Sequence, residues 1–362
     1  MLDQLGPRYV IKLHNPTLSV RGFLVIDNTT LGPGKGGIRM TPTVTEEEVG
    51  RLARAMTYKN ALAGIPFGGA KAGIVFDPKT NDPKTKKQVV EWFARELKPF
   101  LPQLYIAGPD INMTEKEMAI FVGAVKDRRA ATGKPARLGG LPHELGSTGF
   151  GVMVATKIAL QKIDRPLRGA RVAIEGFGNV GSFAAKLLES QGAKIVAVSD
   201  SRGTIYNPNG LKSAELIKVK KRTGSVTNYL NSEKLSGAAI FELAVDVLIP
   251  AALPDVINKN NVDKIKAKII IEGANIAVTA EAEAKLSANG VLIIPDIVAN
   301  AGGVISSYAE YRGWSKEKMF KLVQDKIAHS VTAVLAGAGK TNQRPRQAAL
   351  ALAEKMLGSF HP

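Results

Sequence analysis

The chain has 362 residues, of which 45% are hydrophobic and 22% charged, a composition typical of a folded globular protein of two domains. No run of about 18 apolar residues predicts a membrane span, and no hydrophobic signal core precedes the first strand. The chain has no cysteine, which excludes disulfides and thiolate catalysis, and its four histidines have no metal-ligand spacing. We therefore expect a cytoplasmic protein without a metal site.

The net charge of +17 suits the attraction of anionic substrates. The basic residues are spread along the chain and aromatic content is only 6%, so we expect no nucleic-acid partner. The densest basic run, residues 218–222, is more simply the polar end of a surface helix.

The first part of the chain is predicted to mix strands and helices. Apolar runs at residues 10–13 and 23–26 predict strands, and a glycine-rich turn follows at 31–37. Thr45 with Glu48 has the capping-box spacing and predicts a helix. The other elements expected here are strands at 72–76 and 104–107, a helix at 86–100, and a helix after a second capping box at 114–117.

A polar, glycine-rich stretch at residues 132–151 marks the expected domain boundary. Beyond it, short apolar runs suited to a buried parallel sheet alternate with helices, at 172–175, 195–199, 245–249, 269–272 and 292–295. This alternation predicts a doubly wound α/β domain. Residues 316–360 are expected to be helical and to add no strand.

Three lysines lie in glycine-rich or helical settings within one short block: Lys35, Lys59 and Lys71. A basic side chain beside flexible backbone is suited to hold a carboxylate. Lys71 comes just before an expected apolar strand, where burial would disfavour its charged form and make it usable as a base. A single lysine of this kind could equally be a solvated loop charge, but three together favour a site.

Residues 176–181, GFGNVG, match the dinucleotide-binding pattern G-x-G-x-x-G. The motif follows an expected strand at 171–175 and opens an expected helix at 182–189, which is the context that the pattern requires. Gly176 permits the tight turn, Gly178 lets backbone approach a pyrophosphate, and Gly181 allows close packing of helix on strand. Asn179 and Val180 complete the motif at the helix N-terminus, whose amides favour phosphates. We expect a Rossmann domain.

Asp200 comes 19 positions after the last glycine of this motif, where an acidic residue binds the adenosine ribose of NAD. Ser201 and Arg202 follow directly, and an arginine there can accommodate the 2′-phosphate of NADP. The sequence slightly favours NAD, and use of both cofactors stays open.

Several blocks along the chain match one known family in order and spacing. They are GKGGIRM, MTYKNALAGIPFGGAKAGI, GPDIN, VAIEGFGNVG, AVSDSRGTIYNPNGL, VLIPAAL and IPDIVANAGGVISSYAEY. Together they cover about Gly32 to Tyr311 and resemble the glutamate/leucine/phenylalanine/valine dehydrogenase family. The resemblance implies reversible oxidative deamination of an L-amino acid in a cleft between two domains, with hydride passing to a nicotinamide cofactor.

The resemblance also implies roles for individual residues. Lys59 matches the lysine that binds the substrate α-carboxylate. Lys71 matches the catalytic lysine that activates water, and Asp110 matches the aspartate that carries protons to and from the amino nitrogen. Without the lysines, Asp110 would be taken for a turn residue after Gly108 and Pro109.

Lys35 bears on the choice of substrate. Members of the family that act on glutamate have a lysine here, which meets the side-chain carboxylate with the help of a serine that matches Ser307. Members that act on leucine, valine or phenylalanine have an apolar residue. The resemblance therefore implies glutamate, 2-oxoglutarate and ammonia as the reactants, because a buried unpaired ammonium rejects apolar side chains.

On the cofactor side, the resemblance places Thr148, in the turn after Ser147, near the nicotinamide. Asn275 and Asn300 match positions close to the nicotinamide ribose. The family also implies an assignment of domains: substrate binding and oligomerisation at 1–145, the dinucleotide at 146–314, and C-terminal helices 315–362 returning to the first domain across the hinge.

The chain departs from the family pattern in two places. The N-terminal helical extension common in the glutamate-specific members is missing, which bears on the homo-hexamer that the resemblance implies. In the segment GGLPHELGSTGFG, an arginine that helps those members to hold the substrate is replaced by His143 or Glu144.

Two alternatives to glutamate oxidation are open at this point. One is a dehydrogenase for leucine, valine or phenylalanine. The other is a catalytically silent paralogue that senses a nucleotide or 2-oxoglutarate, which would have no need of the proton-transfer pair Lys71 and Asp110.

Overall fold

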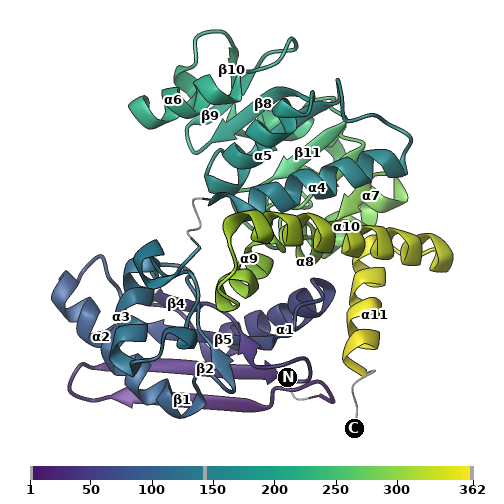
Figure 1. Cartoon of the computed structure of the whole chain (residues 1–362). Coiled ribbons are helices and arrows are strands. Elements are labelled where there is room, and N and C mark those ends of the chain that lie inside the picture. Colours follow the sequence, from purple (N-terminus) through teal and green to yellow (C-terminus); the bar gives the residue numbers. More distant parts are fainter. Residues whose placement is uncertain (1–2, 142–144, 359–362) are drawn as a thin grey trace. The chain divides into compact units, whose positions relative to one another are not determined.

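A computed structural model describes residues 3–141 and 145–358. The chain divides into two compact units (Figure 1). Unit 1 runs up to Leu145 and includes Val304–Met319 and the segment from Ala353, whereas unit 2 comprises Gly146–Gly303 and Phe320–Leu352. The main division falls within the glycine-rich stretch at residues 132–151, and residues of the C-terminal part belong to both units. The assignment of substrate and dinucleotide binding to these parts stays a prediction.

Unit 1 is built on a six-stranded mixed sheet with the order β1-β2-β5-β3-β6, and β4 pairs with β5 beyond this path. The strands are β1 (Tyr9–Asn15), β2 (Val20–Asn28), β3 (Gly34–Lys35), β4 (Ile38–Thr41), β5 (Gly68–Val75) and β6 (Tyr105–Ile106). β2 pairs antiparallel with β1 on one side and with β5 on the other, whereas the pairs β3–β5, β3–β6 and β4–β5 are parallel. Its helices α1 (Glu46–Leu62), α2 (Pro83–Leu97) and α3 (Glu115–Val125) lie at the positions expected from the sequence.

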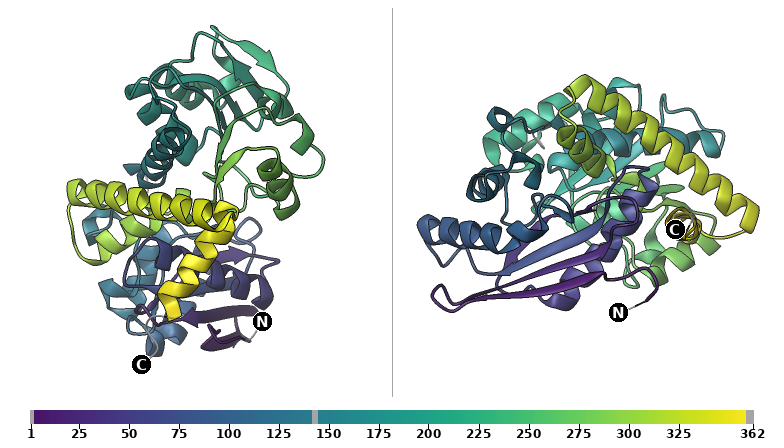
Figure 2. Two further views of the ribbon diagram at one scale, coloured as in Figure 1. Left: turned by 90° about the vertical axis from the view of Figure 1, so that its right-hand side faces the viewer. Right: turned by 60° about the horizontal axis from the view of Figure 1, so that its bottom comes forward.

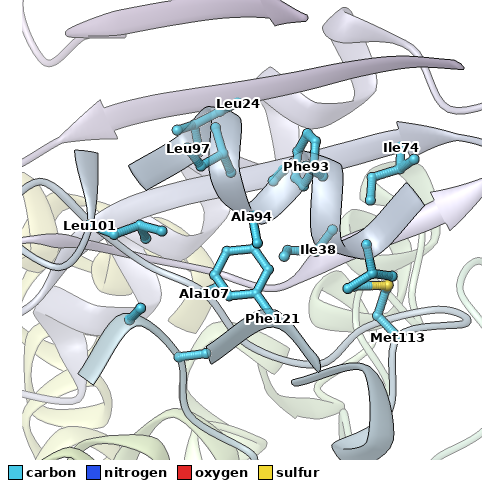
Figure 3. Packing of buried hydrophobic residues seen from close by; sticks show 14 of the residues in the cluster. Leu24, Ile38, Ile74, Phe93, Ala94, Leu97, Leu101, Ala107, Met113 and Phe121 are labelled. Carbon is cyan, nitrogen blue, oxygen red and sulfur yellow. The ribbon is translucent and has the colours of Figure 1, made fainter. Parts of the chain in front are cut away.

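The core of unit 1 lies between the sheet and the helices α2 and α3. Leu24, Ile38 and Ile74 point from three strands toward Phe93 of α2 and Phe121 of α3, and all five side chains are fully buried (Figure 3). Burial of large apolar side chains of this kind contributes roughly 1.5–3 kcal/mol each. The sheet that carries Lys35 and Lys71 therefore packs on a well-buried apolar core.

The two predicted capping boxes differ in the structure. At α3, Thr114 and Glu117 form the complete reciprocal box. At α1, the Thr45 side chain accepts from the Glu48 amide, but the Glu48 carboxylate binds the Arg39 guanidinium. This second contact draws the start of α1 to β4.

Unit 2 contains a seven-stranded sheet with the order β10-β9-β8-β7-β11-β12-β13. Its strands are β7 (Arg171–Glu175), β8 (Lys194–Asp200), β9 (Gly203–Tyr206), β10 (Glu233–Leu235), β11 (Val247–Pro250), β12 (Ile269–Ile271) and β13 (Leu292–Ile294). The five neighbouring strands β8, β7, β11, β12 and β13 are parallel and correspond to the five predicted apolar runs. β9 and β10 add an antiparallel edge that the sequence analysis missed.

The helices of unit 2 cover both faces of this sheet. α5 (Asn179–Ser190) connects β7 to β8 on one side of the strand order, and α7 (Ala280–Ala288) connects β12 to β13 on the other. Because crossovers between parallel strands are right-handed, helices that lead in opposite directions lie on opposite faces. Figure 2 shows helices on both sides of the sheet, as a doubly wound fold requires. The other helices of its first part are α4 (Ser147–Lys162), α6 (Ser213–Thr223) and α8 (Asp296–Ala299).

The last part of the chain is helical, as the sequence predicts. It forms α9 (Gly302–Tyr311), α10 (Lys316–Thr341) and α11 (Pro345–Gly358), and no further strand follows β13 in the described chain. α11 leaves the end of α10 in a different direction (Figure 2). Arg346 at the start of α11 bonds acidic residues of unit 2, which explains why most of this tail belongs to that unit. Within residues 3–141 and 145–358, no helix combines the length and apolarity needed to cross a membrane.

Candidate active site

Lys71 and Asp110 form an ion pair in unit 1. The Lys71 ammonium lies 2.6 Å from Oδ2 of Asp110, and Lys71 is only 8% exposed. Lys71 is within β5, which begins at Gly68, rather than ahead of a strand. Asp110 follows β6, and its backbone exchanges two hydrogen bonds with Met113. The structure thus brings together the two residues that the resemblance assigns to proton transfer.

Arg39 in β4 is a third member of this cluster. Its Nε lies 3.2 Å from the same Asp110 oxygen, and its Nη1 binds Glu48. Burial acts to raise the pKa of the Asp110 carboxyl, but the charges of Lys71 and Arg39 outweigh it and the pKa is lowered. Asp110 is therefore an anion at neutral pH. Arg39 belongs to the block GKGGIRM, but the sequence does not reveal its contact with Asp110, because that contact depends on the pairing of β4 with β5.

Lys35 lies in the two-residue strand β3, between β5 and β6, where the sequence predicts a turn. Its ammonium donates to the Ala107 carbonyl at 3.0 Å, and the residue is 4% exposed. Burial lowers the pKa of Lys35 to about 7; the Glu310 carboxylate opposes the shift, and the neighbouring charges of Lys71 and Lys134 add to it. Lys35 is thus a buried amine near Lys71 that is a cation below about pH 7.

Lys134 and Glu310 form a buried ion pair that the sequence analysis did not single out. The Lys134 ammonium lies 2.6 Å from Oε1 of Glu310, and the amides of Gly133 and Leu141 donate to Oε2. Ser307 lies three residues before Glu310 on α9, so the two share one helix face. The contacts of Glu310 thus hold the face that carries Ser307 against unit 1.

Lys59 lies in the last turn of α1 and is buried. α1 packs closely on β5, because a Cβ added at Gly69 would come within 2.6 Å of Thr57 backbone and side-chain atoms. Glycine is required at this contact. Lys59 and Lys71 therefore come from two elements in direct contact, as a shared site requires.

In unit 2, the three glycines of GFGNVG have different environments. Gly176 has a φ of +87°, and a Cβ there would lie 2.6 Å from that of Ala252. A Cβ at Gly181 would lie 1.9 Å from the Gly176 carbonyl oxygen, so this glycine permits the contact of helix and strand. A Cβ at Gly178 would meet nothing within 4 Å. The space beside Gly178 is what a bound pyrophosphate needs.

α5 begins at Asn179, directly after Gly178, rather than at residue 182 as expected. Gly178 has no side chain to cap the first amides of the helix. Asn179 and Val180 thus belong to the first turn, where amide donors and the helix dipole favour an anion. The residues present fit the phosphates of a dinucleotide.

Asp200, at the end of β8, is already hydrogen-bonded within the protein. Its oxygens accept from the amides of Arg202 and Val226 and from the Ser225 hydroxyl, and the Lys220 ammonium lies 3.7 Å away. Burial acts to raise the pKa of Asp200, but these donors and the Lys220 charge lower it overall. The neighbouring Ser201 and Arg202 are exposed.

The three residues expected near the nicotinamide occupy one region of unit 2. Nδ2 of Asn300 donates to Oδ1 of Asn275 at 3.1 Å and to the Gly273 carbonyl at 3.3 Å. Thr148 is in the first turn of α4, where a Cβ added at Gly303 would lie 3.1 Å from its hydroxyl. Asn275 and Asn300 are in contact, and α4 closely approaches the start of α9.

No group of three or more acidic or histidine side chains that could hold a metal ion occurs in the described parts of the chain. His143 and Glu144, which take the place of the family's arginine, lie outside the described residues.

Comparison with known proteins gives consistent results over nearly the whole chain. The profile of the Glutamate/Leucine/Phenylalanine/Valine dehydrogenase family matches residues 139–359, and that of its dimerisation domain matches residues 9–127. A glutamate dehydrogenase of Aeropyrum pernix is 42% identical over 98% of this chain and 88% of the relative. An NADP-specific glutamate dehydrogenase of Saccharolobus shibatae is also 42% identical, over 83% of this chain and 72% of the relative.

Among solved structures, the hetero-hexameric glutamate dehydrogenase of Thermus thermophilus in its leucine-bound form superposes with a TM-score of 0.89. It is 31% identical, and the match covers 98% of this chain and 89% of that one. With the paired Lys71 and Asp110 and the dinucleotide motif in place, the chain belongs to the Glutamate/Leucine/Phenylalanine/Valine dehydrogenase family.

Proposed function

We propose that this protein catalyses the reversible, NAD(P)-dependent oxidative deamination of L-glutamate. L-glutamate, water and NAD(P)⁺ give 2-oxoglutarate, ammonium, NAD(P)H and a proton. The observation that carries the proposal is the buried cluster of Lys35, Lys71 and Asp110 in a chain that also has the dinucleotide motif. It offers a proton-transfer pair and a separate buried cation for a second carboxylate.

In this proposal, Lys59 binds the α-carboxylate and Lys35 binds the side-chain carboxylate with help from Ser307. The bound nicotinamide supplies the hydride acceptor, near Thr148, Asn275 and Asn300. These assignments rest on the resemblance, and the burial of Lys35 and Lys59 supports them. A lysine that is taken out of water binds a carboxylate more strongly than a solvated one does.

Asp110 and Lys71 divide the proton transfers. Asp110 is an anion and can accept a proton from the substrate ammonium, which allows hydride to leave Cα and an iminium to form. In this scheme Lys71 releases its proton to solvent, as the proton that the overall reaction yields, and then takes a proton from the water that attacks the iminium carbon. Asp110 returns its proton to the amino nitrogen, which leaves as ammonium.

We propose that the protein accepts both NAD and NADP. Asp200 would discriminate against a 2′-phosphate if its charge faced the ribose uncompensated. Its contacts with Ser225, Val226 and Lys220 leave fewer acceptor positions for a ribose hydroxyl and offset its charge. The name of the Saccharolobus shibatae relative supports the use of NADP.

We also propose a homo-hexamer. The match of residues 9–127 to the family's dimerisation domain supports an oligomer, and the related structure from Thermus thermophilus is hexameric by its title. Light scattering of the purified protein at several concentrations measures the mass directly.

An assay of the purified protein with glutamate, leucine, valine and phenylalanine, each with NAD and NADP, tests the function. We expect glutamate to have the highest kcat/KM with either cofactor. A preference for leucine or valine would assign the chain to another specificity in the same family. Absence of turnover with preserved nucleotide binding would indicate a sensor.

Replacement of Lys35 by leucine tests the basis of substrate choice. A charge-assisted contact contributes about 1.5–3 kcal/mol, so Lys35→Leu is expected to lower kcat/KM for glutamate about ten- to two-hundredfold. The ratio of kcat/KM for glutamate to kcat/KM for norvaline should fall as well. An unchanged ratio would mean that Lys35 does not contact the substrate side chain.

A further inference from the structure

One arginine near the C-terminus joins four elements of unit 2. Arg346, at the start of α11, donates from Nη1 to Asp296 at 2.8 Å, from Nη2 to both Glu272 oxygens at 2.7 and 2.9 Å, and from Nε to Glu283. The three acidic residues come from the end of β12, from α7 and from the start of α8. Figure 1 shows α7, α8 and α11, which this side chain connects.

The acidic residues are almost completely removed from water. Glu272, Glu283 and Asp296 are 0%, 2% and 4% exposed. Burial and the charge of Asp296 raise the pKa of Glu272, whereas Arg346 acts to lower it. Loss of the guanidinium would leave several buried carboxylates close together, which is strongly unfavourable. The position of Arg346 is therefore tightly constrained.

The same acidic residues hold two backbone segments together. The Asp296 amide donates to Glu272 at 3.0 Å, and the Ile276 amide donates to Asp296 at 3.1 Å. These bonds fix the segment 272–276 against the start of α8. Ile276 has a φ of +51°, which is rare for a β-branched residue and indicates that its surroundings impose the conformation.

The two segments carry Asn275 and Asn300, the amides in contact with each other. Asn275 lies directly before the strained Ile276, and Asn300 ends α8. Arg346 binds the carboxylates at the other ends of both segments. A shift of its guanidinium would therefore move both asparagines relative to each other.

We propose that Arg346 is a positioning residue for the nicotinamide end of the cofactor. It acts through Glu272 and Asp296, which set the geometry of the pair Asn275 and Asn300. The inference rests on the proposed function in one respect, that these asparagines face the nicotinamide ribose.

The test compares Arg346→Lys and Arg346→Gln with Arg344→Gln. Lysine keeps the charge but cannot bind three carboxylates in a fork, and glutamine removes the charge. Arg344 lies two residues earlier, is partly buried, and hydrogen-bonds only Gln347 among the contacts described, so it is a matched control. Binding of NADH and NADPH is measured by fluorescence titration without amino acid, and KM and kcat are measured well below the unfolding temperature of each variant.

We expect Arg346→Lys to weaken cofactor binding and lower kcat by at least about tenfold, while the KM for glutamate changes little, because small displacements of positioning groups have large effects. Arg344→Gln should match the wild type. The effect of Arg346→Lys should largely disappear when Asn275 and Asn300 are both alanine, since it acts through them.

Folded Arg346→Lys protein with wild-type cofactor affinity and kcat would overturn the inference, as would a full effect in the alanine background. The Lys variant keeps the test decisive should the Gln variant not fold. Wild-type protein that fails to bind NADH or NADPH would instead contradict the proposed function, so the two failures are distinguishable.

Discussion

At the scale of single residues, the cluster in unit 1 depends on charges placed where water is largely excluded. The Asp110 carboxylate forms ion pairs with both Lys71 and Arg39. The Lys35 ammonium donates to the Ala107 carbonyl, and the charge of Glu310 acts to raise the pKa of Lys35. Such contacts are worth more in a buried site than in water. Small changes in these groups should therefore have large effects on catalysis.

Removal of either proton-transfer group should slow the chemical step without loss of the cofactor. We expect Lys71→Ala and Asp110→Asn each to lower kcat at least about a hundredfold, the usual effect of losing an acid-base group. The control is Lys87→Ala in α2, whose side chain is 59% exposed. Turnover near the wild-type value in either variant would remove that residue from the mechanism.

The lowered pKa of Lys35 predicts a pH effect on substrate choice. In the free enzyme Lys35 is an ammonium below about pH 7 and loses its proton as the pH rises through that value. Since kcat/KM reports the free enzyme, the glutamate-to-norvaline ratio of kcat/KM should fall as the pH is raised from about 6 to about 9. Taking the ratio cancels the pH dependence of the steps that the two substrates share. A ratio that stays constant, or one that falls equally in Lys35→Leu, would contradict this assignment.

At the scale of elements, the junction of β7 and α5 shows how one motif serves both folding and binding. Gly181 packs against the Gly176 carbonyl, whereas Gly178 borders open space. The close packing that the motif predicts at Gly181 is present, and pyrophosphate binding at Gly178 stays a prediction. The motif did not predict the start of the helix, since Asn179 and Val180 are not strong helix formers.

Two substitutions at this junction should separate binding from stability. Gly178→Val places a side chain in open space at a φ of −82°, so we expect a folded protein that no longer binds dinucleotide. Gly181→Ala brings a Cβ against backbone and should destabilise the fold by about 1–3 kcal/mol. Circular dichroism melting and NADH fluorescence titration measure the two effects. Unchanged NADH and NADPH affinity in folded Gly178→Val would show that the cofactor binds elsewhere.

At the scale of the whole molecule, the net charge of +17 is the dominant long-range feature. A positive field raises the local concentration of anions and is screened by salt, with a Debye length of about 10 Å at 0.1 M. The substrates of the proposed reaction differ in charge, since 2-oxoglutarate has two negative charges and ammonium one positive charge.

Salt should therefore affect the two substrates of reductive amination differently. We expect an increase in NaCl from about 0.02 M to about 0.3 M to raise the KM for 2-oxoglutarate several-fold, with a smaller or opposite change for ammonium. Steady-state kinetics at fixed cofactor concentration measure both. Parallel changes in the two constants would show that the net charge does not act on substrate binding.

The sequence by itself determined the features that depend on local patterns. Short apolar runs gave the five parallel strands of unit 2, Thr114 and Glu117 predicted the cap of α3, and the glycine motif predicted a nucleotide cradle. Lys71 and Asp110 could be selected only with the help of the family resemblance, because an aspartate in a glycine-proline turn has no distinctive local signal.

The tertiary structure decided which side chains meet across elements. The contacts of Arg39 with Asp110, of Lys134 with Glu310 and of Arg346 with three carboxylates join residues that are 50 to 176 positions apart in the sequence. The bond of Arg39 to Glu48, nine positions away, is the local one in this set. The strands β3, β9 and β10 have two to four residues and are stabilised by their partners in the sheets. Periodicity does not reveal such short segments, and long-range ion pairs leave no trace in the local sequence, because both depend on packing that only the folded chain provides.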